Sequence, residues 1–235
     1  SKIRERVKDP KIAEKLIPKN HAFGTRRVPM ETFYYEVYNQ DNVELVDIRE
    51  APIEKITPTG IQVGERHIDL DILVYATGFD GVTGALDKID IRGRKGITLK
   101  EAWANGPSTY LGLQARGFPN FFTLVGAHNG ASFCNIGVCG ALQVEWVTEM
   151  LSYMHEHNLK YSEPTAEYEE QWTRHVYEVY SKTLLVDSDA WWVKTTQNPD
   201  GSTERRALIY VGGAPEYRAR CAEIAANDYE GFFLA

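Results

Sequence analysis

Residues 71–80 read Asp-Ile-Leu-Val-Tyr-Ala-Thr-Gly-Phe-Asp, and this stretch indicates the fold more clearly than any other. The apolar run at 72–76 is too short for a typical helix, so it predicts a buried strand. Gly78 follows directly and allows the chain to turn tightly or to approach a ligand closely. Open α/β sheets bind nucleotides outside the carboxyl ends of their strands, so a nucleotide site is expected here. By itself, the pattern fits a plain strand and turn equally well.

The composition excludes several classes of protein. The 235 residues suffice for one large domain or two small ones, and 43% apolar and 25% charged residues are usual for a globular protein. The net charge of −7 argues against a nucleic-acid partner. No apolar run approaches the roughly 20 residues of a membrane span, and no secretory signal is present. We therefore expect a cytoplasmic protein without a membrane partner, whose cysteines Cys134, Cys139 and Cys221 are reduced.

Hydrophobic periodicity and turn residues predict an alternation of helices and strands. Helices are expected at 3–16, 31–39 and 139–155, after Pro164 and from Pro215. Strands are expected at 43–47, within 53–76, at 121–125 and at 208–211. The result is an α/β chain with fewer strands than a complete doubly wound domain requires. The opening Ser-Lys, without methionine, is typical of a fragment and equally of a processed or tagged terminus.

Two pairs of residues are candidates for chemistry. Arg26 and Arg27 lie in a loop bounded by glycine and proline, Phe-Gly-Thr-Arg-Arg-Val-Pro at 23–29. An arginine pair is usually a solvated surface feature, but a guanidinium can also stabilise an anionic oxygen or bind a phosphate with two hydrogen bonds. Trp191 and Trp192 are equally ambiguous, because paired tryptophans are often core residues and an indole N–H can also reach a ligand.

The loop at 126–137 is rich in small residues and joins a predicted strand to a predicted helix. As a structural loop it needs only its glycines. As a site it would bring backbone N–H groups, Phe133 and Ile136 against a flat ring. His155 and His157 are two apart on a predicted helix and face different sides, so no metal site is predicted. The chain contains no GxGxxG fingerprint.

Taken together, these segments resemble the C-terminal part of a type I Baeyer–Villiger monooxygenase, a flavoprotein. Ala-Thr-Gly-Phe-Asp is similar to the ATG signature of flavoprotein monooxygenases. The loop at 129–136 resembles members that act on cycloalkanones or polycyclic ketones. The resemblance is carried by ordered blocks: FGTRR (23–27), YYEVYNQDNVELVD (34–47), ATGFD (76–80), TGALDKIDIRG (83–93), GPSTYLGL (106–113), GFPNFF (117–122), VEWV (144–147) and YVGG (210–213).

The resemblance implies a specific architecture and two cofactors. The fold would be α/β, formed by the C-terminal portions of two Rossmann-like dinucleotide-binding domains. Residues 1–22 would end a helical insertion, 23–76 would return to the NADP-binding domain, and 77–235 would return to the FAD-binding domain. The family's FAD and NADP fingerprints would precede residue 1, so we expect an N-terminal portion of the same enzyme as partner.

The resemblance also implies roles for residues on the NADP side. Arg27 matches the arginine that stabilises the flavin peroxyanion and the intermediate formed with the ketone. Arg26 occupies the position, commonly lysine, that contacts the 2′-phosphate of NADP. Trp191 matches the tryptophan that hydrogen-bonds bound NADP.

Other residues match the FAD site and the substrate pocket of the family. Thr77 and Gly78 form the turn of the ATG signature at the FAD site. Ile136 falls where the family places a hydrophobic residue against the flavin. Phe133 and Asn135 fall in the ketone pocket.

The complete enzyme would use NADPH and O₂ to insert oxygen next to a ketone carbonyl, through a flavin C4a-peroxide, and so produce an ester or lactone. Two alternatives stay open. An N- or S-oxygenating flavin monooxygenase would share ATG-like segments but would not need Arg27. The isolated chain could instead be a non-catalytic fragment that needs an N-terminal partner polypeptide.

Overall fold

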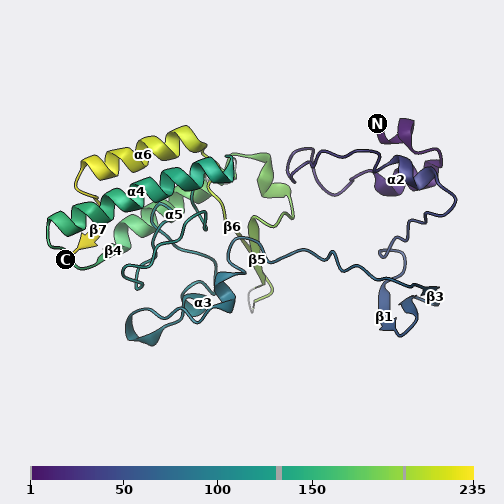
Figure 1. Ribbon diagram of the computed structural model, residues 1–235, viewed down its shortest axis with the longest axis horizontal. Helices are drawn as coiled ribbons and strands as arrows, with labels where there is room; N and C mark the ends of the chain where they lie inside the picture. The colour runs from purple at the N-terminus through teal and green to yellow at the C-terminus, as the bar shows by residue number, and fades with distance from the viewer. Residues whose placement is uncertain (1, 131–133, 198–199) are drawn as a thin grey trace. The chain divides into compact units, whose positions relative to one another are not determined.

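The computed structural model describes residues 2–130, 134–197 and 200–235, with the side chain of residue 197 excepted. The chain divides into two compact units, Ser1–Gly78 and Phe79–Ala235 (Figure 1). Each unit is described by itself below.

The first unit opens with two short helices, α1 (Lys2–Arg6) and α2 (Pro10–Leu16). The prediction of one helix over 3–16 is wrong because a new helix begins in its middle. The Asp9 side chain accepts a hydrogen bond from the Lys11 N–H (2.7 Å), and Pro10 occupies the first turn, where a missing N–H is harmless.

A charged cluster connects α1 to the 3₁₀ helix η1 (Glu36–Asn39). The Arg6 guanidinium donates to Glu31 (2.5 Å) and Glu36 (2.6 Å), and these bonds lower the pKa of both carboxyl groups. Of the helix predicted at 31–39, only the last four residues are helical, and they form a 3₁₀ helix. Phe33, with φ 59°, has a left-handed backbone that an α-helix does not accommodate.

The first unit contains an antiparallel three-stranded sheet in the order β1 (Ile53–Thr57), β2 (Gly60–Val63) and β3 (Arg66–Asp69). It confirms the predicted strands in the first part of 53–76. The strands predicted at 43–47 and 72–76 are wrong, because neither stretch pairs with another strand of the described residues. Residues 72–76 are exposed instead of buried, with Ile72 at 80% and Val74 at 79% exposure.

The second unit is mainly helical. Its long helices confirm the three predicted after residue 136, and each begins at a recognisable cap or proline: Asn135, Thr165 and Pro215. The helices are η2 (Leu86–Lys88), η3 (Arg94–Gly96), α3 (Leu99–Ala102), α4 (Ile136–Glu156), α5 (Ala166–Ser181), η4 (Leu184–Asp187) and α6 (Ala214–Ala226). Figure 1 shows α4 and α6 running side by side, and Trp146 of α4 donates its indole N–H to the Cys221 carbonyl of α6 (2.9 Å).

Two small antiparallel pairs complete this unit: β4 (Ser162–Pro164) with β7 (Phe232–Leu234), and β5 (Val193–Gln197) with β6 (Thr203–Ala207). The strands predicted at 121–125 and 208–211 are wrong. The apolar residues 208–210 follow β6 directly and are buried in the core as an irregular segment, so their apolar character reflects burial and not a strand. The mixed α/β class is confirmed, although every strand pair among the described residues is antiparallel.

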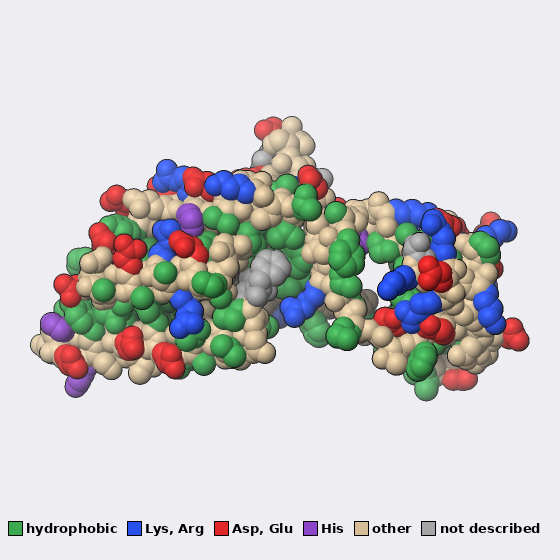
Figure 2. All heavy atoms as spheres, turned by 90° about the horizontal axis from the view of Figure 1, so that it is seen from above, with side chains coloured by type: hydrophobic (Ala, Val, Ile, Leu, Met, Phe, Trp, Pro, Cys, Tyr) green, Lys and Arg blue, Asp and Glu red, His purple; other side chains and the backbone are tan. Residues whose placement is uncertain are grey.

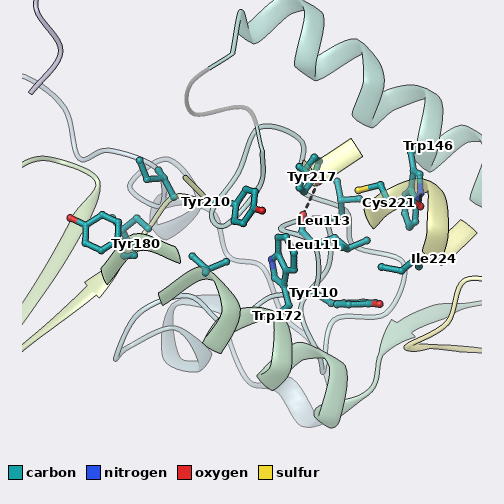
Figure 3. Close-up of a cluster of buried hydrophobic side chains, with 14 of the residues drawn as sticks. Tyr110, Leu111, Leu113, Trp146, Trp172, Tyr180, Tyr210, Tyr217, Cys221 and Ile224 are labelled. Atoms are coloured by element: carbon teal, nitrogen blue, oxygen red, sulfur yellow. Dashed lines mark hydrogen bonds between the residues drawn. The ribbon is translucent and has the colours of Figure 1, made fainter. Parts of the chain in front are cut away.

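The large core of the second unit is formed by side chains of the three long helices and of the segments at 110–113 and 207–210 (Figure 3). Its polar aromatic side chains satisfy backbone carbonyls of neighbouring loops. The buried Tyr217 hydroxyl donates to the Leu111 carbonyl (2.7 Å), and Tyr110 donates to the Glu230 carbonyl (2.9 Å). Burial raises the pKa of both phenols, so both remain protonated donors.

Cys134 and Cys139 form a disulfide at the beginning of α4, with Cα atoms 6.2 Å apart. The expectation of three reduced cysteines is therefore wrong for these two. Cys221 is free and buried, and burial raises its thiol pKa to about 12.

Hydrophobic side chains also lie at the surface (Figure 2). Among the described residues, no helix has the length and apolar character needed to cross a membrane. The exposed apolar residues include Phe23, Met30, Tyr75, Phe79 and Val138.

We predict that Tyr217→Phe lowers the free energy of unfolding by about 1–3 kcal/mol, because the buried Leu111 carbonyl loses its donor. Urea denaturation measures the change. Tyr168→Phe is the matched control, since that hydroxyl donates to Glu230 in an exposed position and its loss should cost less than about 1 kcal/mol. Equal destabilisation in the two variants would contradict the prediction.

Candidate functional site

The loop that carries the two arginines begins with a tight turn. Gly24 has φ 81°, a backbone conformation that favours glycine. Thr25 is buried, and its hydroxyl donates to the Ala22 carbonyl (2.7 Å). This anchor fixes the backbone directly before Arg26, which is half-buried, and Arg27, which is exposed.

Arg27 makes no ion pair with any residue in the described part of the chain. Its guanidinium therefore keeps its N–H donors for another acceptor. Arg6 and Arg49 of the same unit contrast with it, since each pairs with a carboxylate close by. From the sequence alone, the two arginines could be a solvated surface pair or a functional pair. In the structure their surroundings differ, since Arg26 is half-buried and Arg27 is exposed.

Thr77 and Gly78 lie within the exposed stretch at 71–80. The need for glycine is confirmed, because Gly78 has φ 85°. A Cβ added at Gly78 would meet nothing within 4 Å, so the turn presents open backbone. A flat cofactor could approach this backbone closely.

The beginning of α4 carries Asn135 and Ile136. The Asn135 side chain accepts a hydrogen bond from the Val138 N–H (3.2 Å), so it is the N-cap of the helix. Ile136 is 61% exposed, and the first N–H groups of α4 are the positive end of the helix dipole. Phe133, the other residue predicted for this loop, lies outside the described residues.

His128 holds the beginning of this loop, and sequence reasoning missed it. The fully buried imidazole lies between Thr109 Oγ1, 3.3 Å from Nδ1, and the Ala207 carbonyl, 3.0 Å from Nε2. A carbonyl can only accept, so Nε2 carries the proton and Nδ1 accepts from Thr109. Burial lowers the pKa of His128 to about 4 and keeps the ring neutral. A histidine among glycine and alanine gives no periodic signal from which this role could be predicted.

The two tryptophans have different surroundings. Trp192 is 3% exposed and belongs to the core, whereas Trp191 is 56% exposed. Their ring centroids are 5.2 Å apart. The Ser188 carbonyl, upstream of both, accepts a hydrogen bond from Arg205 of β6 (2.5 Å), and the β5–β6 hairpin begins directly after Trp192. The structure therefore assigns the core role to Trp192 and leaves the Trp191 indole accessible.

The predicted site residues are distributed over both units. Arg26, Arg27, Thr77 and Gly78 belong to the first unit. Asn135, Ile136 and Trp191 belong to the second unit. In both units most of these residues are exposed, and none of them belongs to a hydrophobic core cluster.

The chain is similar to several known monooxygenases over nearly its whole length. No family model matches the chain. Over 234 residues the chain is 64% identical to 2-oxo-Δ³-4,5,5-trimethylcyclopentenylacetyl-CoA monooxygenase of Pseudomonas putida, covering 100% of this chain and 43% of the relative. A Baeyer–Villiger monooxygenase of Pseudooceanicola batsensis is 39% identical over 97% of this chain and 41% of its own length.

Phenazine N-monooxygenase of Lysobacter antibioticus is 40% identical over 100% of this chain and 42% of its own length. Among solved structures, a complex of OTEMO with FAD and NADP matches with a TM-score of 0.94 and 62% identity, covering 100% of this chain and 43% of that one. The chain thus spans less than half the length of the proteins that it matches.

The whole chain corresponds to a portion of a flavin-dependent monooxygenase. Within that class it belongs to the type I Baeyer–Villiger monooxygenase family, as its sequence motifs predicted.

We predict that acid destabilises the second unit through His128. Its pKa is lower in the folded state (about 4) than the ordinary 6.5, so its contribution is fully present above pH 6.5 and is lost as the pH falls towards 4. The loss is about 3 kcal/mol for such a difference. The free energy of unfolding, measured by urea denaturation between pH 7 and pH 4, should depend less steeply on pH in His128→Gln. The exposed His155→Gln is the control, and an unchanged slope in His128→Gln would exclude this role.

Proposed function

We propose that this chain is the C-terminal part of an NADPH- and O₂-dependent Baeyer–Villiger monooxygenase that converts ketones to esters or lactones. The observation that chiefly supports the proposal is the match of the whole chain, at 62% identity, to an OTEMO structure containing FAD and NADP. The exposed positions of most of the described site residues agree with it.

The described residues fit a flavin cofactor. Gly78 offers backbone without a side chain, and the beginning of α4 offers N–H groups beside the exposed Ile136. Thr77, Gly78 and Ile136 would hold FAD, which supplies the oxygen-activating chemistry when bound. Asn135 and Phe133 would line the ketone pocket.

Arg27 would act on developing negative charge. Its guanidinium has no carboxylate partner among the described residues, so binding an anionic oxygen would not require breaking an existing ion pair. Guanidinium groups stay protonated and donate several N–H bonds in a fixed plane. Arg27 would therefore stabilise anionic oxygen during the attack on the ketone carbonyl, without accepting a proton itself.

Arg26 and Trp191 would hold NADP. The half-buried Arg26 follows the anchored Thr25 and would contact the 2′-phosphate, where a planar guanidinium can make paired hydrogen bonds. The exposed Trp191 indole would donate its N–H to the same cofactor.

The domain assignment belongs to the same proposal. Residues 1–22 would end a helical insertion, 23–76 would belong to the NADP-binding domain, and 77–235 to the FAD-binding domain. An N-terminal portion of the enzyme would cover the exposed apolar stretch at 72–75 by pairing with it as a strand. The exposure of Ile72, Val74 and Tyr75, together with the span of less than half of each relative, supports this partner.

The N-oxygenating alternative has a specific observation in its favour, the 40% identity to phenazine N-monooxygenase. Attack on a ketone carbonyl creates an anionic tetrahedral oxygen that needs stabilisation, whereas oxygen transfer to a nitrogen lone pair creates none on the substrate. The need for Arg27 therefore distinguishes the two reactions.

We predict that Arg27→Ala in the complete enzyme lowers the rate of ester formation by about 10²–10³-fold, the usual cost of removing one such donor. Reduction of FAD by NADPH should continue, because the substitution leaves the cofactor in place. Stopped-flow absorbance follows the reduction and gas chromatography the ester. Arg49→Ala, whose side chain pairs with Asp47, is the control. Normal ester yield in Arg27→Ala would exclude the assigned role.

We predict that Arg26→Ala lowers the preference for NADPH over NADH by about 10–100-fold, because one charge-assisted phosphate contact is lost. The ratio of kcat/KM for the two coenzymes measures the preference. Arg26→Lys should retain most of it through the remaining positive charge. An equal loss with both coenzymes in Arg26→Ala would argue against a phosphate contact.

A further inference from the structure

Gly81, three residues after the ATG turn, lies against Trp191 within the second unit. A Cβ built on Gly81 would be 2.8 Å from Cε3 of the Trp191 ring and 3.2 Å from the Trp191 carbonyl oxygen. Real Cβ atoms essentially never lie within 3.0 Å of another heavy atom. An indole ring is rigid, so any side chain at position 81 must displace the ring or the backbone beneath it.

The turn that presents Gly81 is tight and strained. The Thr83 N–H donates to the Gly81 carbonyl (2.6 Å), which closes a three-residue turn. Val82, at its centre, has φ 58°, a conformation that β-branched residues rarely adopt. The Val82 side chain packs against the large core, and a Cβ at Gly84 would collide with Asp80. The turn is therefore held in place and cannot easily move away from Trp191.

The opposite side of the contact is also fixed. Trp192 is buried in the core, and its carbonyl accepts the Leu208 N–H (2.8 Å). The Val193 N–H donates to the Ala190 carbonyl (3.0 Å), which closes the turn around Trp191. With the backbone on both sides held, the exposed indole of Trp191 is the part that can yield.

We propose that Gly81 is a positioning residue for Trp191, whose indole orientation depends on the absence of a side chain at position 81. The strain at Val82 agrees with this role, since strained backbone persists where the surroundings over-determine it. The consequence for NADP rests on the proposed function of Trp191, whereas the contact between Gly81 and Trp191 does not.

The first test measures the contact independently of NADP. The complete FAD-containing enzyme is labelled with 5-fluorotryptophan, and Trp191→Phe assigns the ¹⁹F resonance of Trp191. Gly81→Ala should shift this resonance. Gly96→Ala should leave it unchanged, because Gly96 also has a left-handed backbone (φ 76°) but an added Cβ there meets nothing within 4 Å. An unshifted Trp191 resonance in Gly81→Ala overturns the proposal.

The second test measures the consequence for the coenzyme by titration calorimetry with NADP⁺. Gly81→Ala should raise its Kd about fivefold, as expected for loss of one hydrogen bond, with FAD content unchanged. In a Trp191→Ala background the same substitution should change Kd by less than about twofold, because the two residues act together. An equal fivefold change in both backgrounds overturns the proposal. A shifted resonance together with an unchanged Kd in Trp191→Ala supports the positioning contact and overturns the NADP role of Trp191.

Gly81→Ala could also prevent folding. Gly81→Ala/Trp191→Ala should then restore a folded, FAD-containing protein, because the smaller side chain removes the collision. Failure of this double variant to fold, when Trp191→Ala alone folds, overturns the proposal.

Discussion

The second unit depends on buried aromatic donors that satisfy the backbone carbonyls of its irregular segments. Its strand pairs are short, so long loops enter the core without a sheet to pair their carbonyls. A buried carbonyl without a donor costs free energy comparable to a lost hydrogen bond. Tyr110, Trp172 and Tyr217 each bury a large ring and also donate to a loop carbonyl, of Glu230, His128 and Leu111 respectively. One side chain thus provides both hydrophobic burial and a loop anchor.

His128 extends this arrangement to the loop that leads to α4. Its backbone N–H donates to the Leu208 carbonyl, its carbonyl accepts from Trp172, and its ring contacts Thr109 and Ala207. All four polar groups of one residue are therefore paired, and the backbone at position 128 is fixed. Such support from outside a site is what holds reactive groups in position during a reaction. The same logic applies to Gly81, which supports Trp191 through close contact instead of hydrogen bonds.

The first unit is organised differently, through charge. Arg6 pairs with Glu31 and Glu36, and Lys15 pairs with Glu50 (2.7 Å). Exposed ion pairs contribute little stability individually and weaken with salt. The exposed apolar stretch at 72–75 is consistent with a unit that gains further burial from the N-terminal portion proposed above.

The sequence by itself determined the family, the three long helices and the need for glycine at position 78. Helical periodicity and capping residues act within a few neighbouring positions, so α4, α5 and α6 could be predicted from local pattern. Only the tertiary structure decided the fate of the short apolar runs. Residues 72–76 and 208–211 look alike in sequence, yet the first stretch is exposed and the second enters the core, because burial depends on which distant segments are there to cover it. The roles of His128 and Gly81 were likewise invisible in the sequence, since each depends on a contact with a distant residue, Ala207 for His128 and Trp191 for Gly81.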